Sequence, residues 1–347
     1  MSSFRRAGTA AAAPSSGSSS TAAASSALPR GTKAFLNNQT LVSSGLRELD
    51  AWIGGGFVLG TVVTVEPPAF ESFGADVLRY FAAEGLIAKQ RVYINASSVR
   101  ESLPLELSTA QKQLKAQLAD VKESGDKLKI AWQYEKYAAD KQLPIADTRF
   151  CHSFDLSKPI QAHYLDTCRV LAAATDYRVT FAAMQQALLD HPNDVIRFVL
   201  ADIGSPWLYG DVTTDHEAQF LQFLRAVRGL MAHHRHRAIC MMTVPTFALS
   251  APLVKSVRHL SDYAFEMSSF LGDTLPPELR DFSGLCYVHR LATAHSLTSH
   301  VVESVKMGIK RDRRKLKLEH LHLPPEGSRS NKTEKQSTSS AADPLAF

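Results

Sequence analysis

The sequence has little of what marks several classes of protein. Only four of its 347 residues are cysteines, and no two have C-x-x-C spacing: they are Cys151, Cys168, Cys240 and Cys286. This usage suits a reducing compartment and indicates neither a disulfide framework nor a zinc site. No apolar run approaches the ~20 residues that cross a bilayer. We therefore expect no membrane segment, no bound metal and no cofactor.

The sequence also lacks a large excess of either positive or negative charge. There are 39 Lys and Arg residues against 34 Asp and Glu residues, a net charge of +5. A balance this mild permits nucleic acid as a partner without requiring one. The apolar fraction of 45% is that of a soluble protein with a packed core.

Both ends of the chain are expected to be disordered. Residues 1–32 are dominated by Ser and Ala, and residues 326–347 are polar. Neither segment offers enough apolar surface to order itself. The N-terminal tail, which has arginines and no acid, also resembles a transit peptide. We favour disorder because its arginines do not recur on one helical face. Residues 33–325 are then one domain, with a surface insertion near 101–129.

Within that domain the apolar pattern alternates between strands and helices. The β-branched run Thr61–Val65 predicts a buried strand, residues 76–89 a helix, and Arg91–Asn95 the next strand. A strand–helix–strand unit implies parallel strands joined by a right-handed crossover. Further strands are expected at 195–201 and 238–244, helices at 180–190 and 217–233, and antiparallel strands in 284–323. The fold class is therefore α/β, with a mostly parallel central sheet and antiparallel C-terminal strands.

The most informative segment is the loop that follows the first of these strands. It is entered through a short helix carrying Leu46 and Leu49, the tight turn Gly54–Gly56, and Gly60. RecA, KaiC and related ring ATPases begin their fold in this way. Their phosphate loop reads G-x-x-x-x-G-K-[ST], in which backbone N–H groups and the lysine hold the phosphates.

Here the ligands of that loop are missing. It reads EPPAFESFG and contains no lysine; its informative positions are Glu66, Pro67, Pro68, Glu71 and Gly74. The two prolines have no N–H to donate. Each glutamate would repel a phosphate by about 4 kcal/mol at ~4 Å and an effective dielectric of ~20. We expect a RecA-like fold of the P-loop NTPase type whose phosphate loop is degenerate, with no catalytic residue.

Asp202 follows a hydrophobic strand, at the place where RecA-like proteins carry the acid that binds magnesium. Without the lysine and the hydroxyl of the phosphate loop, we interpret it as a turn or helix-capping residue before Gly204-Ser-Pro206. No nucleophile-elbow pattern supports hydrolase chemistry.

The segment SSGLRELDAWIGGGFVLGTVVTVE, residues 43–66, resembles the Elongator complex protein 4 family, RecA-like subunits of eukaryotic Elongator. Other segments resemble the family as well: KIAWQY (129–134), RFCHSFDLSK (149–158), IGSPWLYGD (203–211), FLRAVRGL (223–230) and LHLPPE (321–326). Together they extend over roughly residues 33–326.

The resemblance implies a function that composition does not reveal. Elongator modifies C5 of the wobble uridine (U34) of certain tRNAs, giving carboxymethyl-type groups such as 5-methoxycarbonylmethyl and carbamoylmethyl uridine. Its chemistry resides in another subunit, in the core of subunits 1 to 3. Subunits 4, 5 and 6 form a hetero-hexameric ring that binds tRNA. The resemblance also implies that the protein is located in the cytoplasm and the nucleus. An active ring ATPase, or an assembly scaffold without RNA contact, remains an alternative.

Candidates for tRNA contact come from basic segments. In RecA folds the loops after the fourth and fifth core strands face the central hole, and the second of these, expected at 245–258, carries Lys255 and Arg258. The most basic stretch, 306–317, contributes Lys310, Arg311, Arg313 and Arg314. Each segment could equally contact a neighbouring subunit or solvent. The run His233–Arg237 could touch RNA phosphates, or be a solvated helix end.

Overall fold

A computed structural model describes residues 28–107, 150–171, 176–209, 214–292 and 304–321. The tail predictions concern residues that lie almost entirely outside these ranges, as do residues 108–129 of the expected insertion. Among the described residues, no helix combines the length and apolarity needed to cross a membrane.

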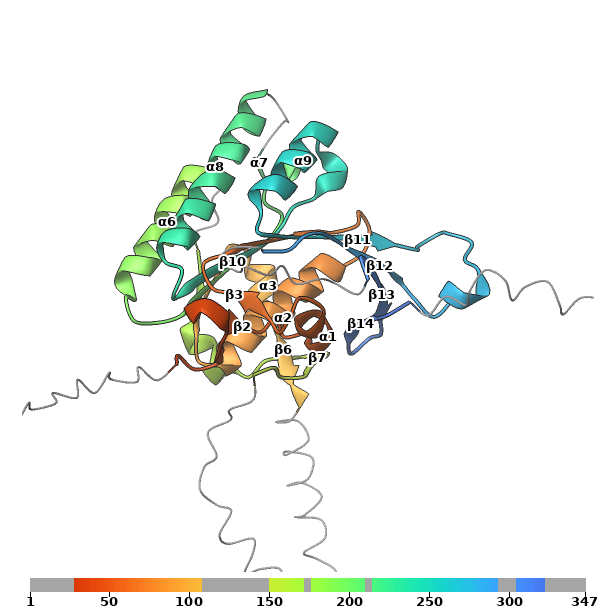
Figure 1. Cartoon of the computed structure of the whole chain (residues 1–347), viewed down its shortest axis with the longest axis horizontal. Coiled ribbons are helices and arrows are strands. Elements are labelled where there is room, and N and C mark those ends of the chain that lie inside the picture. Colours follow the sequence, from red (N-terminus) through yellow and green to blue (C-terminus); the bar gives the residue numbers. More distant parts are fainter. Residues whose placement is uncertain (1–27, 108–149, 172–175, 210–213, 293–303, 322–347) are drawn as a thin grey trace, which may run out of the picture.

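One large sheet organises the chain (Figure 1). In spatial order its strands are β14 (Leu316–Glu319), β13 (Lys306–Arg311), β12 (Gly284–Arg290), β11 (Tyr263–Ser269), β4 (Val62–Glu66), β10 (Ala238–Thr243), β9 (Ile196–Leu200), β5 (Arg91–Ile94) and β8 (Cys168–Val170). Pairing is parallel from β11 to β8 and antiparallel from β11 to β14. This confirms the predicted α/β class, with a mostly parallel sheet and antiparallel C-terminal strands.

Helices cover both faces of the sheet. One face carries α1 (Arg47–Trp52), α2 (Phe73–Ile87) and α3 (Ser97–Glu101), and the other α6 (Tyr177–Asp190), α8 (Thr214–His233) and α9 (Ala251–Leu260) (Figure 1). Along β10, Ile239 and Met241 pack with α2, whereas Cys240 and Met242 pack with α8. Because both faces are buried, the central strands are mainly apolar rather than alternating, with polar exceptions such as Thr64 of β4 and Arg197 of β9.

Smaller elements complete the fold. Two small antiparallel sheets are formed by β1 (Thr32–Ala34), β2 (Thr40–Val42) and β3 (Phe57–Val58), and by β6 (Pro104–Glu106) and β7 (Phe154–Pro159). The short helices are η1 (Leu36–Asn38), η2 (Ala162–Thr167), α7 (Pro206–Tyr209), η3 (Thr246–Ala248) and η4 (Pro277–Leu279).

The first residues of the expected insertion are not on the surface. Leu103 and Leu105 are buried, and β6 pairs with β7, which lies on the far side of residues 108–149. The prediction of a surface segment near 101–129 is therefore wrong for residues 103–106, whereas Glu101 is exposed. The charged residues that suggested a surface insertion lie further along the chain. The apolar side chains of β6 pack with α2 and β7.

The glycines of the entry motif behave as predicted. Gly54, Gly55 and Gly56 have φ of 94°, 114° and 132°, a region that disfavours any side chain. At Gly60 a Cβ would lie 2.7 Å from the Cα of Arg235, so this glycine allows β4 to start against the turn that follows α8. Leu46 and Leu49 are both buried, as their spacing indicated.

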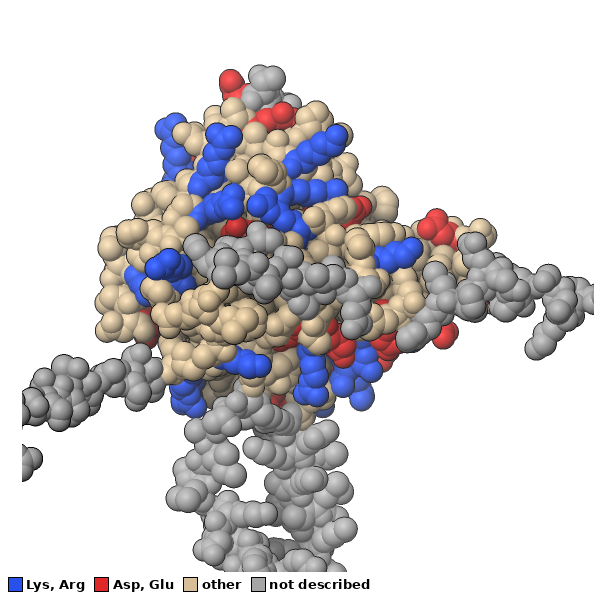
Figure 2. Space-filling view, in the orientation of Figure 1, with Lys and Arg blue, Asp and Glu red and all other residues tan. Residues whose placement is uncertain are grey.

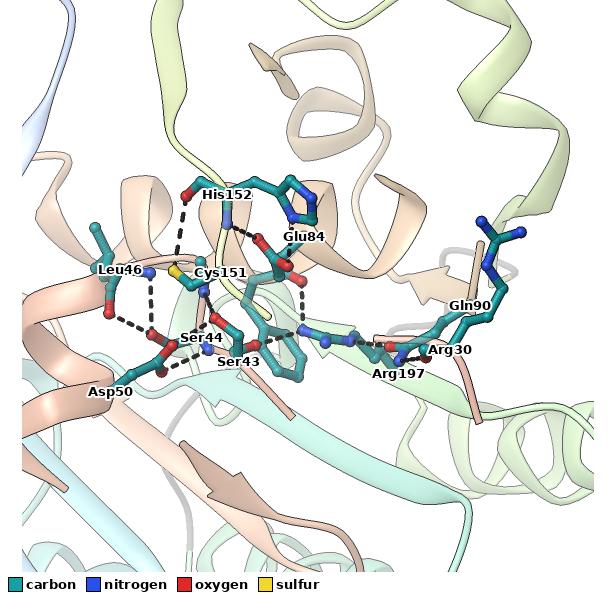
Figure 3. A network of polar contacts seen from close by, with 12 residues as sticks. Arg30, Ser43, Ser44, Leu46, Asp50, Glu84, Gln90, Cys151, His152 and Arg197 are labelled. Atoms are coloured by element: carbon teal, nitrogen blue, oxygen red, sulfur yellow. Dashed lines mark hydrogen bonds and ion pairs between the residues drawn. The ribbon is translucent and has the colours of Figure 1, made fainter. Parts of the chain in front are cut away.

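A buried polar network, which the sequence did not reveal, joins the entry motif to the sheet (Figure 3). Arg197 of β9 is fully buried and donates to the Gln90 side chain at 2.6 Å and to the backbone oxygens of Ser43 and Phe81. Its guanidinium also lies 4.6 Å from the centre of the Phe81 ring. Gly85 of α2 leaves it room, since a Cβ there would be 2.7 Å from the Arg197 Cδ. Burial lowers the pKa of Arg197 to about 10.

The same network holds two buried acids (Figure 3). Asp50 accepts the Ser43 hydroxyl at 2.5 Å and the Ser44 N–H at 2.8 Å, while burial raises its pKa to about 6. The carboxylate of Glu84, on α2, accepts a hydrogen bond from the backbone N–H of His152 at 2.9 Å and lies 2.8 Å from Nδ1 of the same histidine. These contacts fix α1, α2 and the segment before β7 against one another, which positions the loop after β4.

Candidate functional site at the carboxyl edge of the sheet

The carboxyl ends of the parallel strands meet at one edge of the sheet, where α/β proteins place their ligands. β4 ends at Glu66, a six-residue loop follows, and α2 begins at Phe73. The neighbouring strands β10 and β11 contribute Thr243 and Glu266 to this edge. The expected strand–loop–helix unit is therefore present.

Glu66, the last residue of β4, is fully buried and is held by an arginine from a distant part of the chain. Arg258 of α9 donates from Nε to Oε1 at 2.7 Å and from Nη2 to Oε2 at 2.6 Å. Arg258 also donates to Glu266 at 2.8 Å, and Glu266 contacts the His289 ring at 2.6 Å. Hydrogen bonding to Glu66 raises the pKa of Arg258. The expected repulsive charge of Glu66 is thus neutralised internally, which corrects the sequence interpretation.

The rest of the loop packs against the start of α2. At Gly74 an added Cβ would lie 2.8 Å from the Cβ of Pro67 and 3.2 Å from Thr243 Cγ2. Pro67 and Pro68 are half-buried, and neither can donate an N–H. Glu71 is half-buried. Pro67 is therefore in contact with the first turn of α2, the turn whose N–H groups hold phosphate in an active loop.

Asp202 follows β9 in a left-handed conformation, with φ of 54°. Its N–H donates to the Thr243 hydroxyl at 2.8 Å, and that hydroxyl lies 3.3 Å from its carboxylate. Partial desolvation raises the pKa of Asp202, and the hydrogen bond from Thr243 opposes this. Over the described ranges, no group of three or more His, Cys, Asp or Glu side chains could hold a metal ion. These contacts are those of a turn residue.

A shallow groove of about 630 Å³ opens beside the loop, between Pro67, Phe70 and α9. Its walls are apolar and partly aromatic, and Lys255 and Arg258 lie on its α9 side. Phe70 is 88% exposed at the loop tip. Nearby, Trp207 is 71% exposed and its ring centre lies 5.9 Å from that of Phe247, which lines the groove. Exposed apolar side chains gathered in this way mark a surface that contacts a partner.

With this geometry in view, comparisons with known proteins decide the family. Residues 25–347 match the family described as PAXNEB protein. The chain belongs to the PAXNEB family. It is 27% identical to Elongator complex protein 4 of Dictyostelium discoideum, over 87% of this chain and 79% of that protein. The proteins of the same name from Xenopus laevis and Homo sapiens are 26% and 25% identical, over 86% and 84% of this chain and 84% and 78% of theirs. The resemblance found in the sequence is thereby confirmed.

In this PAXNEB chain, the first pair of tRNA candidates does not lie on a loop. Both belong to α9, which begins at Ala251, so the expected loop over 245–258 was wrong in its second half. Lys255 is exposed. Arg258, one turn further on, is the partner of Glu66 and Glu266, so its charge is used within the fold.

The second group of candidates is divided in the same way. Lys310 pairs with Glu319 at 2.7 Å and lies 4.9 Å from the centre of the Phe282 ring. Arg311 donates to the buried Asp76 of α2 at 2.6 Å. Arg313 and Arg314, in the turn between β13 and β14, are exposed. The four candidates are thus two structural cations, Lys310 joining β13 to β14 and Arg311 joining β13 to α2, and two that face solvent.

Sequence reasoning missed the structural role of Arg258 and the exposed aromatic side chains. No local sequence pattern predicts either feature. Arg258 and Glu66 are 192 residues apart. Trp207 and Phe247 follow different strands, β9 and β10, and are brought together only because those strands are neighbours in the sheet.

Proposed function

We propose that this chain is a non-catalytic subunit of the Elongator complex. The support is its family and its likeness, over at least 84% of its length, to relatives named Elongator complex protein 4. In this proposal it joins subunits 5 and 6 in a hetero-hexameric ring that binds tRNA. The ring assists the catalytic core of subunits 1 to 3 in C5 modification of wobble uridine, in the cytoplasm and nucleus.

The proposal includes a RecA-like fold of the P-loop type. Its support is the unit β4–loop–α2, flanked by parallel strands, which is the arrangement that holds phosphates in P-loop proteins. Asp202 follows β9, separated from β4 by β10 alone, as the magnesium-binding acid of such a fold would be.

One observation carries the non-catalytic part of the proposal, the ion pair between Glu66 and Arg258. A buried carboxylate occupies the start of the loop, and its counter-charge is supplied by the protein instead of a ligand lysine or magnesium. Pro67 lies against Gly74 at the first turn of α2. A triphosphate would have to displace this contact and would find no lysine in the loop.

Ring formation needs a face that a neighbouring subunit covers. The apolar groove beside Phe70, together with Trp207 and Phe247, offers such a face at the edge of the sheet. In this interpretation the loop that would clamp nucleotide between subunits instead supplies apolar contact area.

Titration of Mg-ATP into the full chain, followed by calorimetry, tests the loss of nucleotide binding. We expect no heat of binding at micromolar concentrations. Micromolar affinity that depends on magnesium would overturn the proposal and favour an active ring ATPase.

Co-purification with a tagged chain tests the assembly. The two sister ring subunits and the catalytic core should be recovered with it, and their absence would overturn the proposed membership. Phe70→Ser with Trp207→Ser should reduce recovery of the sister subunits. The matched control, Val179→Ser with Leu189→Ser on the exposed side of α6, should leave it unchanged. Crosslinking of tRNA to the ring separates an RNA-binding subunit from a pure scaffold, because a scaffold would give no crosslink to this chain.

A further inference from the structure

Lys and Arg side chains gather over α8 and α9 (Figure 2). We define the α8–α9 basic face by five residues: Arg225 and Arg228 of α8, Arg235 in the turn after it, Lys255 of α9, and Arg290 at the end of β12. We propose that this face binds the phosphodiester backbone of RNA. The inference rests on the proposed function, since it assigns the surface through which the ring would hold tRNA.

The basic face is continuous across three elements. Arg228 Nη2 lies 3.1 Å from the carboxylate of Asp262, which directly follows α9 and its cap. Arg290 donates to the backbone oxygen of His259 on α9. A hollow of about 650 Å³ is lined by Arg228, Arg235 and Asp262. These contacts bring Arg228 of α8, the end of α9 and Arg290 of β12 to one surface, although Arg228 and Arg290 lie 62 residues apart in sequence.

Three of its five charges are available to an external anion, whereas Arg228 pairs with Asp262 and Arg290 donates to the backbone oxygen of His259. Over the described residues, no carboxylate pairs with Arg225, Arg235 or Lys255. Arg258, Lys310 and Arg311, which basic composition alone had also suggested, are by contrast bound to Glu66, Glu319 and Asp76. Free cations lose less on binding a phosphate because they need not first break an internal pair.

The acids close to the face are already occupied. Asp262 is largely buried, accepts the N–H of Val62 at 2.9 Å and pairs with Arg228. Glu266 pairs with Arg258 and His289. Asp215 and Glu217 lie at the opposite, N-terminal end of α8. The potential over the basic face is therefore positive.

The spacing and the neutral surroundings favour a nucleic acid backbone over an acidic protein. From Arg225 to His233, where α8 ends, the helix rises roughly 12 Å at ~1.5 Å per residue, and Arg235 follows in the turn, so these cations span more than one phosphate of a strand. The hollow lined by Arg228 and Arg235 is also lined by Asn38, Gln39 and Thr40, whose side chains are of the kind that hydrogen-bond phosphate and sugar. Separated cations interleaved with such groups suit a regular polyanion.

Anisotropy titrations of a labelled tRNA transcript with the reconstituted ring, between 50 and 300 mM salt, test this inference. The variant R225Q/R235Q/K255Q removes three charges that make no ion pair in the fold. Each lost phosphate contact lowers the slope of log K against log salt by about 0.7–0.9. We expect the slope to fall by about 2 and affinity near 100 mM salt to fall at least ~10-fold. The matched control R169Q/R178Q/R280Q, also three exposed arginines, should change affinity less than about twofold.

Each outcome has a distinct meaning. If the wild-type ring does not bind the transcript, the proposed tRNA binding fails and this inference with it. If it binds, and R225Q/R235Q/K255Q matches the control, the basic face is rejected while tRNA binding stands. A loss confined to R313Q/R314Q would move the contact to the β13–β14 turn and overturn the assignment. Loss of a protein subunit from the variant on size exclusion, with the RNA affinity of intact rings unchanged, would reassign the face to an acidic protein partner.

Discussion

Removing the guanidinium of Arg258 should destabilise the fold by more than an ordinary surface ion pair would. Arg258→Met keeps the apolar stem and leaves the carboxylate of Glu66 without its counter-charge, fully buried at the end of β4. Removing one member of a buried pair costs about 3–5 kcal/mol, whereas an exposed pair contributes about 0–1 kcal/mol. Because Arg258 is 27% exposed, we expect a loss of about 2–3 kcal/mol.

Urea unfolding of the full chain, followed by circular dichroism, measures this loss as a lower midpoint at constant m-value. For a domain of this size the melting temperature should fall by roughly 3–5 °C. The variant Arg258→Lys is an informative control. It keeps the charge but cannot donate to both oxygens of Glu66 in the bidentate geometry, so its loss should be smaller.

A double-mutant cycle decides whether the loss comes from the pair. Glu66→Gln removes the buried charge, so Arg258→Met in that background should cost at least ~1 kcal/mol less than in the wild type. A loss below about 0.5 kcal/mol for Arg258→Met alone, or strictly additive losses, would refute the role assigned to the pair.

Three further predictions concern Asp50 of α1, Gly74 of α2 and Gly229 of α8. Burial raises the pKa of Asp50 from 3.8 to about 6, so its stabilising contribution is present below pH 4 and lost as the pH rises towards 6. The free energy of unfolding of the wild type should fall between pH 4 and pH 7. In Asp50→Asn this fall should be smaller by on the order of 3 kcal/mol. Equal falls in the two proteins would contradict the burial of this charge. Gly74→Ala should cost about 1–3 kcal/mol by thermal unfolding because its Cβ meets Pro67 at 2.8 Å. Gly229→Ala in α8, where a Cβ meets no atom within 4 Å, should instead stabilise by about 0.5–1 kcal/mol, and effects of the same sign would be inconsistent with this packing.

Much of the fold followed from local patterns. The β-branched run before Glu66 and the run 195–201 are strands because two buried faces favour mainly apolar residues, although Arg197 interrupts the second run. The apolar pattern of 217–233 predicted the helix that the structure shows as α8. The element β6 was missed because three residues carry too little periodicity to separate a strand from a helix. The second half of 245–258 was missed because it was interpreted as a loop through analogy, although Ser250 and Pro252 are typical of a helix start.

For the candidate site, too, some features follow from the sequence and others only from the structure. That the loop after β4 lacks a lysine and carries two prolines is a property of the sequence, and it alone argues against phosphate binding. Which cations are free is not such a property. Lys255 and Arg258 are three residues apart and equally charged, yet one faces solvent and the other is paired with Glu66.

Tertiary structure made that distinction, because parallel strands bring their carboxyl ends to one edge whatever their separation in the chain. At this edge Glu66 meets an arginine 192 residues away, and the same packing leaves Lys255 on the outer side of α9. The sequence by itself determined the α/β class of the fold and the absence of a lysine from the loop after β4, since both depend on residue type at short range. Burial and pairing of each charge depend on contacts between distant segments, which only the folded chain establishes.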